Sequence, residues 1–380
     1  MHNQTLPRNE ERKQKLSAKR FLKIFLQVIV IVVMFAILLW YISSSQAEDG
    51  RSLAEVLLDI KIGYLTLAFL MYFGINILFT VRLKRVLAKD NIKMSLGKTL
   101  LAQYAGMLTS DFTPGRSGYM LTPMYLRDQN VPTSKSLSTI LGIQTIEFLI
   151  KVAGGIGAVI YLVKFVPSTT WSTIFPQTIA GINIGIIIAG FGIGLMLLGA
   201  TVLALFTWSK KAINIFYKIA NIRFIKRFTG GLIGKLEEYK DSAHSTKKAI
   251  PEILVLTLIC WFLKGFEWWF LGLAFGINVP WIAFFLIHPL VTALAFIPFI
   301  PAGLGVQEIG ITGILGLLGV PAITAGAFAI IARILLIAED LIGLPQIVKS
   351  TSLLFTRKKS QDITTDATQQ EYDEQTQMIR

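Results

Sequence analysis

The chain has 380 residues, of which 53% are hydrophobic and only 16% are charged. A soluble domain would carry about a quarter charged residues, so this composition, with several apolar runs of about 18 residues or more, indicates a helical membrane protein and not a β-barrel. The net charge of +14 does not indicate nucleic-acid binding, because the basic residues lie in short segments that flank the apolar runs.

The first apolar run, from about 21 to 43, follows a basic N-terminus formed by residues 1–20. The apolar part of a signal peptide has about 7–15 residues, so this longer run predicts an uncleaved helix that begins in the cytoplasm. Five more full spans are predicted, at 62–81, 137–163, 179–207, 252–276 and 321–347.

The charges of the connecting segments orient these spans in the cell membrane. The 44–61 loop is rich in acids and is predicted to lie outside, whereas 82–98 and the basic 208–250 loop are predicted to be cytoplasmic. The polar tail, 348–380, is predicted to be cytoplasmic and disordered. The transmembrane domain is therefore predicted to extend over 21–347, with both termini in the cytoplasm.

Two further apolar stretches, 97–126 and 281–318, are interrupted by "SDFTPGRSGYMLTP" and "FIPFIPAGLGVQE". Proline removes a helix hydrogen bond and glycine loosens the backbone, so each stretch predicts a broken-helix hairpin that enters and leaves by the same face. The first would enter from the cytoplasm and the second from outside. Both share the pattern F-x-P-x-x-x-G, which is compatible with an inverted repeat; chance similarity of two Gly/Pro turns is the alternative.

The predicted fold is thus an all-α polytopic membrane protein with six full spans and two re-entrant hairpins. Ionisable residues within its membrane segments are candidate functional sites, because lipid solvates charge poorly. Lys264 and Glu267 are expected to neutralise each other beside several tryptophans, and a solvated, interfacial position is the alternative for Glu339 and Asp340. The candidates for gating or proton coupling are Glu147, Glu308, Arg333, Glu339 and Asp340.

The two break motifs favour an anionic ligand, because they expose backbone amides and helix N-termini. Arg116 adds a fixed positive charge that suits a lipid phosphate, with snorkelling to the interface as the alternative. Arg127 lies nearer the membrane edge, where a lipid contact and simple positive-inside placement remain open. The substrate-binding candidates are Pro114, Gly115, Arg116, Gly118, Arg127, Glu147, Lys151, Pro301, Gly303, Gly305, Glu308 and Arg333.

Motifs of common enzymes are missing from the sequence. It contains no P-loop, no H-E-x-x-H, no Cys/His metal set and no G-x-S-x-G nucleophile motif. We therefore expect no catalytic residue, no metal and no cofactor.

The two break motifs, together with the charged residues of the membrane helices, resemble the flippase-like membrane region of the lysylphosphatidylglycerol synthase family. The resemblance covers about 15–350 and rests on Pro114-Gly115-Arg116-Ser117-Gly118, Glu147, the segment from Pro301 to Glu308, and Arg333. Lys151 stands where the family is often acidic. The resemblance implies movement of a charged phospholipid or lipid-linked sugar across the bilayer, and it does not extend to an aminoacyl-transferase domain.

The sequence is best interpreted as that of a lipid flippase whose partners are membrane phospholipids or glycolipids. Two alternatives stay open. One is a non-transporting membrane protein that anchors or regulates a separate synthase or glycosyltransferase of lipid or glycan synthesis. The other is an intramembrane transferase that modifies a lipid, which the lack of a metal or nucleophile set disfavours.

Overall fold

The computed structural model describes residues 52–113, 115–209, 211–212, 239, 243, 246–294 and 303–350. The predicted N-terminus (1–20), the first predicted span (21–43), most of the 208–250 loop and nearly all of the 348–380 tail lie outside the described residues. Pro114 and Pro301, predicted to bind substrate, also lie outside them.

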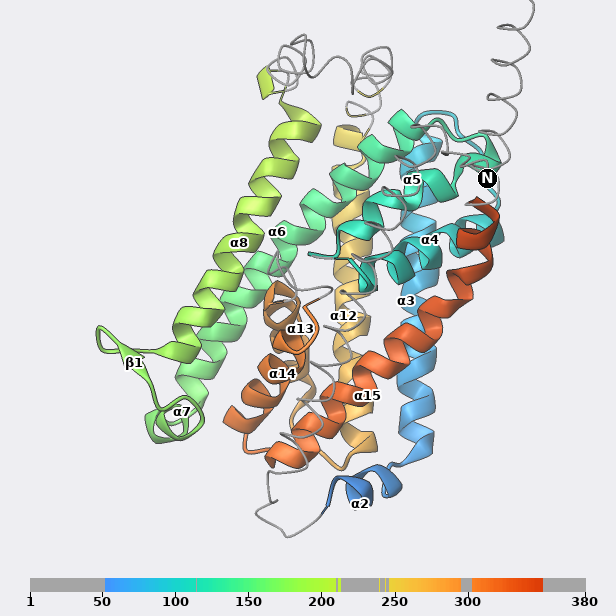
Figure 1. Ribbon diagram of the computed structural model, residues 1–380. Coiled ribbons are helices and arrows are strands. Elements are labelled where there is room, and N and C mark those ends of the chain that lie inside the picture. Colours follow the sequence, from blue (N-terminus) through green and yellow to red (C-terminus); the bar gives the residue numbers. More distant parts are fainter. Residues whose placement is uncertain are drawn as a thin grey trace, which may run out of the picture.

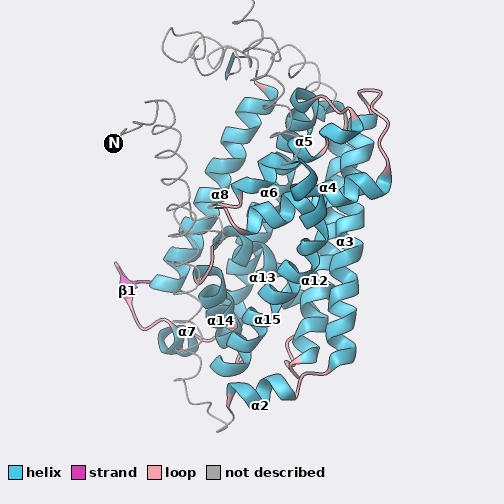
Figure 2. Cartoon of the chain, turned by 45° about the vertical axis from the view of Figure 1, so that its right-hand side comes forward, coloured by secondary structure: helices cyan, strands magenta, loops and turns pink. Residues whose placement is uncertain are grey.

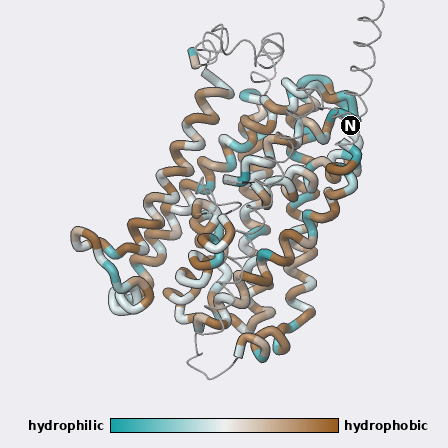
Figure 3. Tube along the Cα trace, viewed as in Figure 1, coloured by the Kyte–Doolittle hydropathy of each residue, from teal (hydrophilic) through white to brown (hydrophobic). Residues whose placement is uncertain are grey.

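Four helices of the described part are long and apolar enough to cross a membrane: α3 (Ile62–Ala88), α6 (Thr133–Phe165), α8 (Ile184–Trp208) and α12 (Ile250–Ala274). Figure 3 shows them as mainly hydrophobic tubes that run the length of the molecule. The chain is therefore a multi-pass membrane protein. The last predicted span contains α15 (Ala322–Asp340), which is not among these four helices and carries Arg333, Glu339 and Asp340.

The shorter elements divide between the two ends of the bundle (Figures 1 and 2). Those at the upper end in Figure 1 are α4 (Leu96–Asp111), η1 (Ser117–Leu121), α5 (Thr122–Tyr125) and η2 (Arg127–Gln129). Those of the lower half are α2 (Leu53–Leu58), α7 (Ser168–Ile174), α13 (Trp281–Leu294) and α14 (Val306–Leu317). Helix α15 crosses obliquely from the lower end to the upper end, where η4 (Leu341–Gly343) follows it.

The predicted span at 179–207 begins too early, because the chain first forms a small antiparallel hairpin of β1 (Thr178–Ile179) and β2 (Ile182–Asn183). Ala180 and Gly181 both have positive φ, at 51° and 78°, which suits a tight two-residue turn. Asn183 then starts α8 by accepting a hydrogen bond from the Gly185 amide at 2.9 Å. The fold is therefore helical apart from this hairpin within the described residues.

Two buried apolar clusters hold the bundle together. One packs α4 and α5 against α3, α6 and α12 at the upper end, and the other packs α13, α14 and α15 against α6 and α12 below. Small residues bring the helices close: a Cβ on Gly154 would lie 2.6 Å from the Trp261 ring and 2.7 Å from Pro289. The long helix α6 therefore contacts both α12 and α13 where the two clusters meet.

We predict that Gly154→Ala destabilises the protein, because the added methyl group has no room between α12 and α13. Overpacking of this kind costs about 1–3 kcal/mol. Thermal unfolding of the detergent-solubilised protein measures the change. Gly190→Ala in α8 is the matched control, since its Cβ would meet no atom within 4 Å, and equal stability of the two variants would contradict the packing argument.

Candidate functional site

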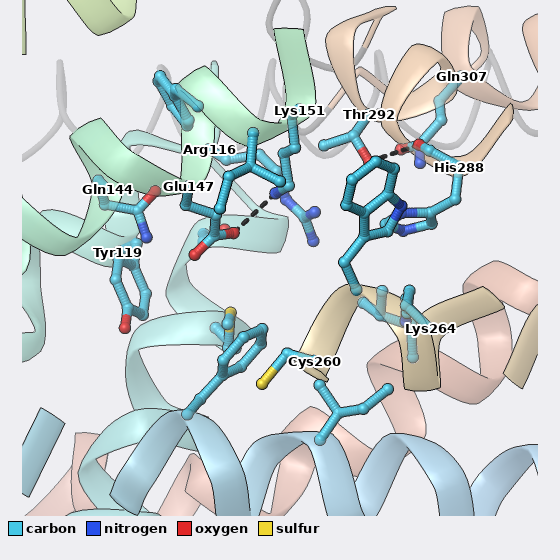
Figure 4. A pocket seen from close by; sticks show the side chains of 18 of the residues that line it. Arg116, Tyr119, Gln144, Glu147, Lys151, Cys260, Lys264, His288, Thr292 and Gln307 are labelled. Atoms are coloured by element: carbon cyan, nitrogen blue, oxygen red, sulfur yellow. Dashed lines mark hydrogen bonds and ion pairs between the residues drawn. The ribbon is translucent and has the colours of Figure 1, made fainter. Parts of the chain in front are cut away.

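A cavity of about 390 Å³ lies in the middle of the bundle. Residues from α3, α4, α6, α8, α12, α13, α14 and α15 line it, together with the turn that follows α4. Both break motifs therefore reach the same space, the first through Gly115–Ser117 and the second through Gln307 and Glu308. Figure 4 shows charged and polar side chains projecting into it from opposite sides.

The first break is a strained turn that carries Arg116 into the cavity. Gly115 and Arg116 both have positive φ, at 59° and 53°, and an arginine there costs about 1 kcal/mol or more because its Cβ crowds the backbone. Thr113 Oγ1 accepts from the Gly118 amide at 2.6 Å, and Gly118 lies so close to Thr109 that a Cβ would be 2.3 Å from its carbonyl oxygen. The turn is thereby held against the end of α4.

The Arg116 guanidinium forms an ion pair with Asp111, the last residue of α4. Arg116 Nη2 lies 2.8 Å from Asp111 Oδ1, and the Asp111 side chain is fully buried. Arg116 keeps partial exposure toward the cavity, which it lines. Its charge is therefore balanced from behind while its open side faces the space between the breaks.

Glu147 on α6 is shared by two cations. Lys151 Nζ lies 2.7 Å from Glu147 Oε1, and Arg82 Nη2 lies 3.1 Å from Glu147 Oε2. Arg82 also donates to Thr257 Oγ1 at 2.6 Å, and the whole residue is only 1% exposed. Lys151 is the more accessible of the two cations and lines the cavity.

At the second break, Arg333 from α15 binds two side chains at the start of α14. Arg333 Nε lies 2.6 Å from Glu308 Oε1, and its Nη2 donates to Gln307 Oε1 at 2.6 Å. Glu308 Oε2 accepts from the Gly305 amide at 2.6 Å, so the acid also caps the start of α14. Gly303 and Gly305 shape the turn with positive φ, at 66° and 82°.

The far wall belongs to α12 and α13. Lys264 Nζ lies 2.6 Å from Glu267 Oε2 and 4.3 Å from the centre of the Tyr72 ring, so the expected neutralising pair is formed. His288 on α13 also lines the cavity and packs edge-on against Trp268.

Six of the twelve predicted substrate-binding residues line the cavity. Those that line it are Gly115, Arg116, Glu147, Lys151, Glu308 and Arg333. Gly118, Gly303 and Gly305 shape the two turns. Arg127 lies apart, exposed, with its Nε donating to Thr133 Oγ1 at 3.2 Å.

Glu339 and Asp340 are fully buried, so the solvated position considered for them is wrong. The cause is the packing of η4 on α4: a Cβ on Gly343 would lie 2.1 Å from the Ala105 amide nitrogen. This close approach covers the end of α15. Asp340 accepts from the Tyr72 hydroxyl at 3.1 Å.

Two residues that matter to the site were missed by the sequence reasoning. Arg82 was assigned to a cytoplasmic segment, but α3 continues to Ala88, which places Arg82 six residues, or about 9 Å, inside the helix. The apolar residues Leu83, Val86 and Leu87 could have indicated that the helix continues past Arg82. Asp111 was passed over although it is an acid inside an apolar stretch, five residues before Arg116.

The charges of the wall favour an anion. Four cations line the cavity (Arg116, Lys151, Lys264 and Arg333) against three acids (Glu147, Glu267 and Glu308), an excess of one positive charge. This count covers the lining residues alone; behind the wall lie the buried cation Arg82 and the buried acids Asp111, Glu339 and Asp340. Within the described ranges, no group of three His, Cys, Asp or Glu side chains could hold a metal ion.

Residues 24–338 match the family described as the lysylphosphatidylglycerol synthase TM region. The chain belongs to this family, and the membrane region that the description names agrees with the membrane-length helices described above.

Two archaeal relatives carry only a family-level description. A UPF0104 membrane protein of Pyrococcus horikoshii is 23% identical over 305 residues, which cover 76% of this chain and 85% of that protein. A UPF0104 membrane protein of Methanothermobacter thermautotrophicus is 25% identical over 162 residues, which cover 39% of this chain and 48% of that protein, about half of its length. No solved structure matches the chain.

We predict that Arg82→Met destabilises the protein by about 3 kcal/mol, since it removes one partner of a buried ion pair. The neighbouring Arg85 is largely exposed, so Arg85→Met is the control and should change stability by less than about 1 kcal/mol. Chemical or thermal unfolding in detergent measures both.

A double variant tests the pairing itself. Because Glu147→Gln removes the carboxylate that Arg82 neutralises, the loss in the double variant should be smaller than the sum of the single losses. Strictly additive losses would contradict an energetic link between Arg82 and Glu147.

Proposed function

We propose that the protein translocates a phospholipid or lipid-linked sugar with an anionic phosphate group, and that the central cavity holds the head group during transfer. The observation that carries this proposal is the cavity itself: both break motifs reach it, and its wall has one more cation than acids. Membership of a family of lipid-related membrane regions supports it.

Two cations form the best phosphate site in the cavity. Arg116 and Lys151 interact electrostatically, and Figure 4 shows their side chains next to each other at the wall. Neither shares an acid with the other, because Arg116 binds Asp111 and Lys151 binds Glu147. A phosphate between them would gain charge-assisted hydrogen bonds from both.

One side of the cavity suits acyl chains. Helix α8 contributes only apolar atoms and glycine to the lining, through Gly199, Val202 and Leu203. Val202 is also 42% exposed on the outer surface, so the cavity reaches the lipid-facing side of the bundle there. A head group can occupy the polar interior while its chains remain in the bilayer.

The arrangement of the short helices supports access from both faces. The short helices lie in opposite halves of the bundle in Figure 1, with α4 and α5 in the upper half and α13 and α14 in the lower half. We interpret these pairs as re-entrant hairpins of opposite sense, between six full spans with cytoplasmic termini, related as an inverted repeat. In such a fold the substrate site lies between the repeats near the middle of the membrane.

We predict that Lys151→Ala lowers the translocation rate at least tenfold, because it removes a cation that faces the head group. The assay uses vesicles of phosphatidylcholine with a trace of acyl-labelled fluorescent phosphatidylglycerol, and dithionite bleaches the outer leaflet. Lys164→Ala, an exposed lysine on the same helix, is the control and should transport at the wild-type rate. Should wild-type vesicles bleach no further than empty ones, the translocase proposal fails and the anchoring alternative gains support.

The hairpins are tested by labelling single cysteines in a Cys260→Ser background with a membrane-impermeant maleimide. Lys93→Cys and Arg127→Cys flank the first hairpin, and Asn278→Cys and Ala322→Cys flank the second; all four positions are exposed. We expect the first two to react from one side of the membrane and the last two from the other. Reaction of Lys93→Cys and Arg127→Cys from opposite sides would show that the first stretch crosses.

A further inference from the structure

Behind Arg116, away from the cavity, the side chains of two acids are buried. The carboxyl groups of Asp340 on α15 and of Asp111 at the end of α4 interact electrostatically. Asp340 is 0% exposed and Asp111 is 2% exposed. Asp111 Oδ2 has no donor from any described side chain or backbone group. Within the described residues, the cation that forms an ion pair with these two acids is Arg116, through Asp111. Two buried carboxyl groups beside one cation carry an unbalanced negative charge unless they share a proton.

We propose that Asp111 and Asp340 form a proton-binding site that couples proton uptake to binding of the anionic head group at Arg116. The proposal rests on the proposed function, because it assigns the coupling ion of the same site. Arg116 is the physical link, since it binds Asp111 on one side and lines the cavity on the other.

A count of charges gives the stoichiometry. In the observed arrangement Arg116 balances one carboxylate, and the shared proton neutralises the other, so the buried group is neutral. A phosphate that binds the Arg116 guanidinium neutralises its charge. The carboxylate that Arg116 had balanced is then a buried anion without a cation, which is strongly unfavourable. One further proton restores neutrality. Binding of one anionic head group should therefore take up one proton.

Within the described residues, no ion pair joins a second cation to Asp111 or Asp340. Tyr72 on α3 donates its hydroxyl to Asp340, and Lys264 on α12 is paired with Glu267. The charged or titratable groups near the pair, or near the adjoining Glu339, are Tyr72, Tyr104, Arg116, Lys264, Glu267 and Glu339. Of these, Tyr72 and Arg116 both contact an acid of the pair and line the cavity, and only Arg116 is a cation.

Glu339 is the competing proton site. It is 0% exposed, its Oε1 has no donor within the described residues, and only the Tyr104 hydroxyl approaches its Oε2, at 3.5 Å. Within the described residues, the ion pair of Arg116 is with Asp111 and not with Glu339. A head group at Arg116 would therefore not directly change the charge balance around Glu339. The experiment separates the two sites.

The test measures proton uptake and affinity together. Full-length protein in a weakly buffered detergent solution is titrated with dihexanoyl phosphatidylglycerol, while a pH indicator reports protons and calorimetry reports binding. We expect about one proton taken up per lipid bound by the wild type. By linkage, the affinity should fall about tenfold for each unit of pH increase over the range in which uptake is complete.

The double variant Asp111→Asn/Asp340→Asn should bind without proton uptake and with an affinity independent of pH. Asp128→Asn is the control: this acid pairs with Lys349 outside the cavity, and uptake should match the wild type. The wild-type stoichiometry tests the proposal even if the double variant does not fold.

Each other outcome is decisive. Binding without proton uptake by the wild type overturns the proton site but leaves the proposed function intact. Loss of uptake in Glu339→Gln, with uptake retained in the double variant, moves the site to Glu339. An affinity that follows the sodium concentration at fixed pH replaces the proton by a metal cation. If wild-type protein binds no lipid at any pH, the proposed function itself fails, and this proposal with it.

Discussion

The need to balance every buried charge governs the centre of this protein. Lipid-facing helices surround a space that holds four cations and three acids, and a single unpaired charge there would cost several kcal/mol. The observed pairs meet this need across helices: Arg82 on α3 with Glu147 on α6, and Arg333 on α15 with Glu308 on α14. The first pair joins helices that are distant in the sequence, and the second joins two consecutive helices. The cavity remains polar because its charges are held by partners at its edges.

The backbone breaks make this arrangement accessible to a ligand. A continuous helix would bury its amides in its own hydrogen bonds and present side chains only along its surface. The turn at Gly115 and Arg116 instead projects a guanidinium into the space, and the turn at Gly303 and Gly305 places Glu308 where it caps α14 and meets Arg333. Irregular backbone at this depth is tolerated because neighbouring helices and the polar cavity cover it.

The parts of the fold that could be read from the sequence are those set by local composition. The long apolar helices and the Gly/Pro interruptions follow from runs of residues that determine solubility and backbone freedom without reference to distant contacts. Helix ends were less predictable. Helix α3 continues past the predicted boundary, where Arg82 has the buried partner Glu147, and α8 starts later because Asn183 and a two-residue turn intervene.

The sequence by itself determined that this is a helical membrane protein with two interrupted segments and with charges inside its apolar helices, since hydropathy and Gly/Pro chemistry are local properties. Only the tertiary structure decided which charges meet. Asp111 becomes a partner of both Arg116 and Asp340, and Arg82 becomes a buried partner of Glu147, because α3, α4, α6 and α15 converge. Ion pairing acts over a few ångströms in space, and no spacing along the chain records which side chains that distance will join.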